Sequence, residues 1–146
     1  MIEVHIQESD FDVGIETERL MADGVGGIAS FIGIVRGDGE LVSLTLDHYP
    51  AMTSHALQSL AETAIARWPV SGVTIIHRIG TMRPGDRIVF VGTASAHRAA
   101  ALDATAFLID RLKTDAPFWK RETFADGRSH WVEARETDDV SAARWG

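Results

Sequence analysis

The sequence predicts one α+β domain, because strand-like segments come in neighbouring pairs joined by turns, and two long helical segments are interspersed without strict alternation. At 146 residues, with 45% hydrophobic and 24% charged residues, the chain can bury a core of its own. We therefore expect antiparallel hairpins and two long helices rather than a doubly wound sheet. The domain is expected over residues 1–136, and the polar residues 137–146 are expected to form a loosely held tail.

The N-terminal residues predict a strand and then a helix. Ile2, Val4 and Ile6 alternate on one face, as in a short strand. The segment "DFDVGIETERLMADG" is typical of a helix that begins at an Asp12 cap and stops at Gly24.

A predicted hairpin follows. The glycine-bounded apolar run "GGIASFIGIVRG" indicates a buried strand that ends at Arg36. The turn "GDGE" leads into "LVSLTLDHY", and we expect the two strands to pair.

The middle of the chain predicts a helix over residues 50–68, closed by Pro69. Its apolar positions, which step by four, one and three residues, are Met52, Ala56, Leu57, Leu60, Ala61, Ala64, Ile65 and Trp68. Two more strands, "GVTIIHRIG" and "RIVFVGTAS", are joined through the turn "RPGD".

A second long helix is predicted over residues 95–114, and Pro117 forbids its continuation. Its buried stripe is expected to consist of Ala100, Ala101, Ala104, Phe107, Leu108 and Leu112. The segments "FWKRETF" and "SHWVEAR" then flank "ADGR", which predicts a hairpin with an Asp-Gly turn.

Composition excludes several classes of function. A net charge of −7 argues against broad binding of nucleic acid or anionic membranes, so an anionic ligand needs a local basic cluster. No apolar run approaches the ~20 residues that span a bilayer, and the N-terminus has no signal-peptide pattern, so we expect a cytoplasmic protein. With no cysteine, the chain has no disulfide, no thiolate metal site and no persulfide.

Both lysines of the chain, Lys113 and Lys120, lie in the stretch "RLKTDAPFWKRETF", whereas arginines carry the other positive charges. A lysine amine can lose its proton in a desolvated or cationic site, which an arginine does not do. Lys113 is expected in the last turn of a helix and Lys120 in the following strand, where both can face one cleft. Alternatively, Lys113 complements the helix C-terminus and Lys120 is a solvated strand residue.

Two further basic groups are candidates for anion binding. His97 and Arg98 are expected to open the second long helix, where free backbone N–H groups and the dipole attract a phosphate. Alternatively, His97 caps or packs and Arg98 is solvated. Arg36, beside a glycine at a strand end, is either a ligand contact or half of a salt bridge.

His48 and His77 fall on strands, and we interpret both as structural histidines with satisfied hydrogen bonds, because neither has a second ligand at metal spacing. No metal site is expected. The sequence also has no phosphate-binding glycine loop and no nucleophilic serine elbow.

Six blocks together carry a family resemblance. They are "SFIGIVR", "LDHYPAM", "VTIIHRIG", "PGDRIVFVGTASAHR", "LKTDAPFWKRE" and "WVEARE". In this order and at these spacings, the chain resembles the large, catalytic subunit of molybdopterin synthase from near its N-terminus to about Glu136. The resemblance implies an α/β-hammerhead-like fold with an added antiparallel sheet.

The implied activity is sulfur transfer in molybdenum cofactor biosynthesis. Enzymes of this family convert cyclic pyranopterin monophosphate (precursor Z) into the dithiolene molybdopterin, with two sulfurs from the C-terminal Gly-Gly thiocarboxylate of a small ubiquitin-like subunit. The large subunit dimerises, which gives a heterotetramer, and no cofactor is implied. The alternative is a non-catalytic adaptor of the same fold that binds a pterin phosphate or the ubiquitin-like partner.

The resemblance also implies roles for particular residues. Lys113 and Lys120 match the catalytic lysines, whose amines can move protons while arginines can only neutralise charge. The substrate-binding positions that it implies are Ile34, Val35, Arg36, His97, Arg98, Lys113, Lys120, Arg121, Glu122 and Arg135. Arg121 and Glu122 are expected to line one wall, and Arg135 is a pocket arginine that can come from the other protomer. Phe31 and Ile109 are assigned to the partner's tail.

The chain departs from the family pattern in a few places. The turn "GDGE" is short, Asp47 and Ala51 stand where Glu and Gly are frequent, and Ile109 stands where Met is frequent. These departures concern loop order and the pocket wall, not the lysines.

Overall fold

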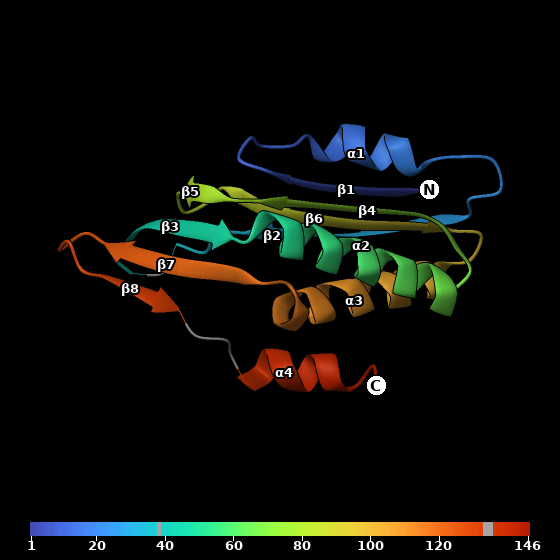
Figure 1. Cartoon of the computed structure of the whole chain (residues 1–146). Coiled ribbons are helices and arrows are strands. Elements are labelled where there is room, and N and C mark those ends of the chain that lie inside the picture. The colour runs from blue at the N-terminus through green and yellow to red at the C-terminus, as the bar shows by residue number, and fades with distance from the viewer. Residues whose placement is uncertain (38, 133–135) are drawn as a thin grey trace.

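The structure is a computed structural model that describes residues 1–37, 39–132 and 136–146. Two four-stranded sheets and the helices around them make up this part of the chain (Figure 1). The elements, in chain order, are β1 (Ile2–Gln7), α1 (Val13–Leu20), β2 (Gly27–Ile34), β3 (Leu41–His48), α2 (Pro50–Arg67), β4 (Val70–Arg78), β5 (Gly80–Met82), β6 (Arg87–Ser95), α3 (Arg98–Asp115), β7 (Phe118–Phe124), β8 (Ser129–Val132) and α4 (Glu136–Ala143).

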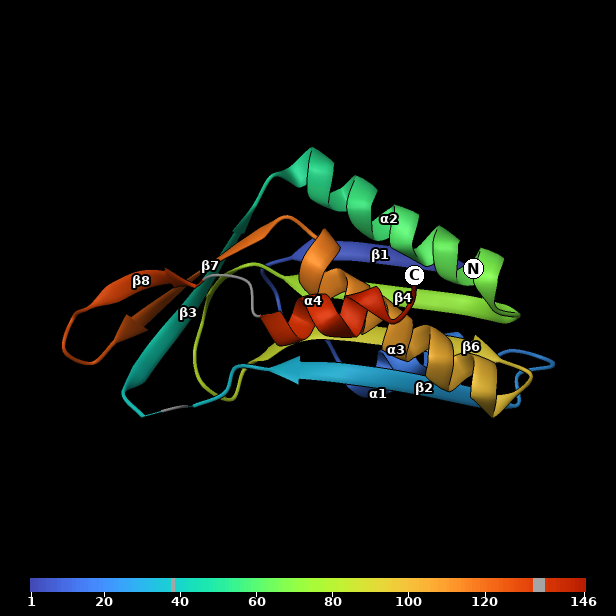
Figure 2. The ribbon, with the colours of Figure 1, turned by 90° about the horizontal axis from the view of Figure 1, so that it is seen from below.

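The first sheet has the strand order β1-β4-β6-β2 and holds the main core. Strands β1 and β4 run parallel, whereas β4 with β6 and β6 with β2 are antiparallel. Helices α2 and α3 cover one face of this sheet and α1 covers the other (Figures 1 and 2). The period of two puts Val73, Ile75, Val89 and Val91 on the face toward α2 and α3, where they form the largest buried cluster.

Helix α3 is fixed to this sheet by buried hydrogen bonds as well as by apolar packing. All six residues of its predicted stripe are buried. The hydroxyl of Thr93 in β6 donates to the Ala101 carbonyl at 2.7 Å, and the hydroxyl of Thr105 lies 3.3 Å from the Ala29 carbonyl of β2. Because the buried hydroxyls of Thr93 and Thr105 both have partners, they hold the helix in one position over the sheet, and this position sets where its last turn ends.

The second sheet has the order β5-β3-β7-β8 and is antiparallel throughout. Figure 2 shows it set off to one end of the first sheet, so that β7 leads away from the end of α3. The two sheets meet at a small buried cluster, which consists of Val35, Leu44, Leu46 and Met82.

The predicted α+β class, the two long helices and the hairpin β7/β8 are confirmed. Strands β4 and β6 do pair antiparallel, but β5, which was not predicted, lies between them in the chain and pairs with β3 in the second sheet. The predicted pairing of residues 27–36 with 41–49 is wrong, because β2 pairs with β6 while β3 pairs with β5 and β7. Strand β2 also ends at Ile34 and is an edge strand, so it is only partly buried. A glycine-bounded apolar run cannot distinguish an edge strand from a central one.

The expectation of a loosely held tail is wrong as well. Helix α4 packs along α3 (Figure 1), and Ala142 is buried. The Trp145 indole N–H donates to Asp110 of α3 at 2.7 Å, and its ring packs against Trp68. One tryptophan at the end of a polar segment thus anchors it, a signal that the average polarity of residues 137–146 conceals. The expected boundary at residue 136 stays a prediction.

Candidate active site

The end of α3 and the start of β7 bring the two lysines together. Lys113 lies in the last turn of α3, whose position is held by Leu112, a residue that is only 3% exposed. The helix ends at Asp115, because Pro117 cannot continue it, and β7 begins at Phe118. The chain therefore turns back on itself between Lys113 and Lys120.

Both lysines line one pocket of about 210 Å³, which we call the lysine pocket. Its walls come from β2, β4, β6, α3 and β7, and they consist of Phe31, Ile32, Gly33, Ile34, His77, Ile88, Val89, Leu112, Lys113, Ala116, Phe118 and Lys120. The prediction that the lysines face one cleft is confirmed. The setting is mostly apolar, so the few polar groups in it interact strongly with a bound anion.

One wall of the lysine pocket is the end of β2, and it contains a position that only glycine fits. A Cβ on Gly33 would lie 2.6 Å from Cγ1 of Val89 and 3.4 Å from the Phe31 ring. Phe31 and Ile34, two large apolar side chains of this wall, are 39% and 55% exposed. This wall therefore offers an open apolar surface next to the lysines.

The remaining polar wall is His77, near the end of β4. Its Nδ1 lies 2.8 Å from the Arg78 carbonyl, and its ring stacks on Phe118 at 3.8 Å between centroids. The pKa of His77 is lowered to about 3, mainly because the ring is buried; the backbone hydrogen bond to Arg78 opposes this shift, and the charges of Lys113 and Lys120 add to it. At neutral pH the imidazole is therefore uncharged and lies between two cations.

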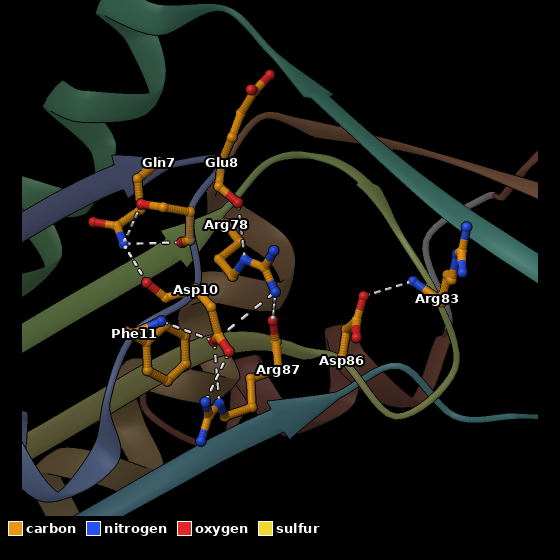
Figure 3. A network of polar contacts seen from close by, with 9 residues as sticks. Gln7, Glu8, Asp10, Phe11, Arg78, Arg83, Asp86 and Arg87 are labelled. Carbon is orange, nitrogen blue, oxygen red and sulfur yellow. Dashed lines mark hydrogen bonds and ion pairs between the residues drawn. The ribbon is translucent and has the colours of Figure 1, made fainter.

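An ion-pair network (Figure 3) holds Arg78, the residue that follows His77 at the end of β4. The Arg87 guanidinium donates two hydrogen bonds to the Asp10 carboxylate, at 3.1 and 2.7 Å. The Arg78 guanidinium donates to the carbonyls of Glu8 and Arg87, at 3.1 and 2.9 Å, and lies 3.9 Å from Asp10. The ends of β1, β4 and β6 are thus tied together beside the lysine pocket.

Charge pairing shifts the pKa values within this network. The hydrogen bonds from Arg87 lower the pKa of Asp10, and the backbone N–H of Phe11 adds to this effect, although burial opposes it. The same pairing raises the pKa of Arg87. Asp10 is about half exposed, so we regard the pair as a geometric tie rather than a large source of stability.

The structure separates some of the residues that the sequence grouped together. The Val35 side chain is buried, and its backbone N–H and carbonyl bond to Asp86 and Gly85, so it offers no group to the lysine pocket. Ile109 packs against the main core. Within the described part of the chain, neither of them nor Arg36, whose side chain is exposed, lines the pocket.

Arg121 and Glu122 do not share a wall within one protomer. Successive residues of a strand point to opposite faces, so Glu122 lies on the same face of β7 as Lys120 while Arg121 points away. The Arg121 guanidinium instead lies 5.8 Å from the centroid of the exposed Trp131 ring. Strand alternation could have separated these two residues from the sequence alone.

His97 and Arg98 lie at the opposite end of α3 from Lys113. Arg98 is the first residue of α3 and His97 is its N-cap, with no side-chain capping bond, and both side chains are exposed. At about 1.5 Å of rise per residue, Arg98 and Lys113 lie roughly 22 Å apart along the helix axis. The predicted position at a helix start is confirmed, but one protomer does not bring this pair into the lysine pocket.

The interpretation of the two strand histidines needs correction. His77 does have the expected structural hydrogen bond, yet its ring also lines the lysine pocket. His48 is not satisfied: its Nδ1 is buried and has no hydrogen-bond partner among the described residues. Gly33 and His77 were not among the predicted site residues. For His77 the missed signal was its alternation with Val73 and Ile75, which puts a polar group on an inward face.

Arg135 lies outside the described residues. Among the residues that the structure describes, no three His, Asp or Glu side chains gather closely enough to hold a metal ion. None of the described helices is long and apolar enough to cross a membrane.

The fold and the lysine pocket define an α+β domain with a cationic, partly apolar site between two sheets. A family model described as "MoaE protein" matches residues 6–115, and the chain belongs to this family. Among curated relatives, the molybdopterin synthase catalytic subunit of Escherichia coli (strain K12) is 51% identical, over 92% of each chain. That of Pseudomonas aeruginosa is 48% identical over 97% of each chain.

Solved structures show the same architecture. The molybdopterin biosynthesis MoaE protein from Burkholderia ambifaria MC40-6 superimposes with a TM-score of 0.86 at 45% identity, over 100% of this chain and 99% of that one. Molybdopterin synthase from Staphylococcus aureus gives a TM-score of 0.80 at 28% identity, over 90% and 96% of the two chains. The predicted family is confirmed.

Proposed function

We propose that the chain is the catalytic subunit of a molybdopterin synthase, an enzyme of molybdenum cofactor biosynthesis. It transfers two sulfurs from the C-terminal thiocarboxylate of a small ubiquitin-like subunit to cyclic pyranopterin monophosphate (precursor Z), which gives the dithiolene of molybdopterin. The observation that carries the proposal is the lysine pocket, in which both lysines of the chain lie beside an open apolar wall. The curated relatives, which bear the name of this catalytic subunit, support it.

The chemistry divides between the partner and this chain. At each of two side-chain carbons of the pterin, the thiocarboxylate sulfur forms a C–S bond while a C–O bond of that carbon breaks and its oxygen leaves, which gives a thioester to the small subunit. Water then cleaves the acyl–sulfur bond of this thioester, which leaves sulfur on the pterin and a carboxylate on the partner. The lysine ammonium groups neutralise the anionic reactants and supply or accept protons at each step. Because the chain has no cysteine, all sulfur comes from the partner in this proposal, and no resident cofactor takes part.

The assembly follows from the same proposal. The Gly-Gly tail of the small subunit enters the lysine pocket along β2, where Phe31 and Ile34 offer apolar contacts. Two copies of the chain form a homodimer, and one small subunit on each copy makes a heterotetramer. This is consistent with a solved complex of subunits 1 and 2 of molybdopterin-converting factor from Helicobacter pylori, which shares the fold at 21% identity. We place the enzyme in the cytoplasm, without nucleic-acid or membrane partners.

The phosphate of the substrate is assigned to His97 and Arg98, and the length of α3 then requires a second copy. The two ends of the helix lie too far apart for one small substrate to touch both directly. In the homodimer, His97 and Arg98 of one protomer serve the lysine pocket of the other. Each active site then contains residues of both copies.

The direct test is reconstitution. The purified chain is mixed with thiocarboxylated small subunit and precursor Z, and dithiolene product is measured. Product formation supports the proposal, whereas binding of both reactants without product, where an authentic family enzyme turns over, would favour the adaptor alternative.

A mixing experiment tests the shared site. Lys113→Ala and Arg98→Ala chains, each inactive or nearly so under subsaturating substrate, are unfolded together, refolded and assayed. If the site is shared, the mixed dimer regains one intact site, with Lys113 from one copy and Arg98 from the other. Absence of any recovery, with mixed dimers confirmed by mass, would place both residues in one protomer's site.

A further inference from the structure

The polar group of the lysine pocket that the proposed function leaves unused is Nε2 of His77. A carbonyl only accepts hydrogen bonds, so Nδ1, 2.8 Å from the Arg78 carbonyl, must carry the ring hydrogen. Nε2 is then a lone-pair acceptor. Nε2 has no hydrogen-bond partner among the described residues. It is also not one of the fully buried side-chain atoms that lack a partner, so part of its surface stays accessible. It therefore opens into the pocket that the ring lines.

The surroundings keep this acceptor neutral. Lys113 approaches from α3 and Lys120 from β7, and His48 of β3 is a further repulsive neighbour if it is charged. The β2 wall is apolar, and Phe118 covers one face of the ring. A proton on Nε2 would be both desolvated and repelled. The lysine pocket thus contains one fixed acceptor flanked by two groups that only donate.

This arrangement selects a particular kind of ligand. A carboxylate or a fully ionised phosphate group offers only acceptors, so it satisfies the lysines but not Nε2. The C-terminal residue of a peptide satisfies all three groups, because its carboxylate or thiocarboxylate is separated from its own amide N–H by a single Cα. The anion pairs with Lys113 and Lys120, and the N–H is left for the acceptor.

We propose that Nε2 of His77 accepts a hydrogen bond from the amide N–H of the terminal glycine of the small subunit's tail. The inference rests on the proposed function, and in it His77 recognises the C-terminal residue of the tail. The network of Figure 3 supports the role, because Arg78, whose carbonyl fixes the His77 tautomer, is itself held by bonds to the carbonyls of Glu8 and Arg87. The acceptor is therefore preorganised before the tail enters.

The test removes the donor and the acceptor separately. The small subunit is prepared with its terminal glycine, and by semisynthesis with glycolic acid in that place, so that an ester oxygen replaces the N–H. Dissociation constants of both forms are measured by calorimetry with the wild-type chain and with His77→Leu. We expect the ester to bind the wild type about three- to tenfold more weakly, the scale of one net neutral hydrogen bond, and His77→Leu to bind both forms alike.

Two variants control the experiment. His77→Gln keeps a side-chain acceptor and is expected to restore part of the preference for the amide. His5→Leu changes an exposed histidine on β1, outside the lysine pocket, and is expected to keep the full preference. Should His77→Leu fail to fold, ¹⁵N NMR of the wild type decides, because the Nε2 resonance must move with the amide tail and stay with the ester.

The outcomes separate the two claims. Equal binding of amide and ester to the wild type, or an unchanged preference in His77→Leu, would overturn the contact while leaving the proposed function intact. No binding of the amide form to the wild type would overturn the proposed function itself.

Discussion

The two ends of helix α3 differ in how they can hold a negative charge. At the N-terminal end, exposed His97 and Arg98 stand beside free backbone N–H groups and the positive end of the helix dipole, so the helix itself favours an anion. At the C-terminal end the dipole is negative and stabilises the charge of Lys113 rather than that of a bound anion. Within one protomer, and among the described residues that line the pocket, the cations that an anion meets there are the two lysine amines.

This difference indicates that the two ends of α3 have different roles, one in binding and one in reaction. The N-terminal end suits binding of a phosphate that does not react, because its donors are backbone groups and a guanidinium that keeps its proton. The C-terminal end suits reaction, because its cations are amines that can exchange protons in a pocket lined mainly by apolar residues. Substitutions at the two ends should consequently separate chemistry from binding.

The largest expected effect is at the C-terminal end. Lys113→Ala should leave a folded dimer with dithiolene formation nearly abolished, and Lys120→Ala should also be strongly impaired. Lys113→Arg tests the acid–base role more specifically, because it keeps the charge and removes the titratable amine. This variant too should lose most of its single-turnover rate. Arg19→Ala, on α1, is the matched control for loss of a cation. Near-normal turnover of Lys113→Arg would leave only an electrostatic role.

The N-terminal end should show the opposite pattern. Arg98→Ala is expected to weaken binding of precursor Z about ten- to hundredfold, the scale of a charge-assisted contact, with a smaller effect on the rate of bound substrate. Titration under single-turnover conditions measures both quantities, and sulfate should compete with substrate in the wild type but less in the variant. Unchanged affinity would move the phosphate elsewhere, with Arg36 as the next candidate.

Local sequence patterns were enough to place the groups at both ends of α3. The apolar period of residues 98–115 and the stop at Pro117 were enough to place Lys113 and Lys120 around one cleft, because both constraints are local. The distance between His97 and Lys113 also follows from the sequence, because the rise per residue of an α-helix is known. What the sequence could not supply was the wall opposite the lysines.

That wall depends on strand pairing, which is a non-local property. Residues 27–36 were expected to pair with their chain neighbours, yet β2 pairs with β6, and this register sets Gly33 against Val89 in the lysine pocket. His77 lies opposite Val89 in the pairing of β4 with β6, but its inward direction follows from local alternation with Val73 and Ile75, so this residue could have been found from the sequence. Turn residues alone do not decide between two strands of similar pattern.

Gly33 lies in the pocket wall and Gly27 at the other end of β2, so the effect of an added Cβ can be compared at the two positions. A Cβ on Gly33 meets Cγ1 of Val89 at 2.6 Å, whereas a Cβ on Gly27 meets Cα of Arg98 at 3.6 Å, which is ordinary contact. Gly33→Ala should cost about 1–3 kcal/mol of unfolding free energy through overpacking, and should slow turnover by moving the pocket wall. Gly27→Ala, beside the start of α3, should change stability by less than about 1 kcal/mol. Equal costs in urea unfolding would contradict the wall geometry.

The smallest expected effect is on the pH dependence of stability. Burial lowers the pKa of His77 from 6.5 to about 3, so between these values the unfolded chain binds a proton that the folded chain does not. The contribution of this group to stability is therefore complete above pH 6.5 and is lost as the pH falls toward 3, by on the order of 1 kcal/mol per pH unit. His77→Gln should flatten the fall of unfolding free energy between pH 6.5 and 5.5, the part of the window where few carboxyl groups titrate. His97→Gln, which replaces an exposed histidine at the other end of α3, is the matched control and should keep the wild-type slope. If His77→Gln also kept that slope, the imidazole would have to be protonated in the folded protein, and the neutral acceptor between the two lysines would not exist.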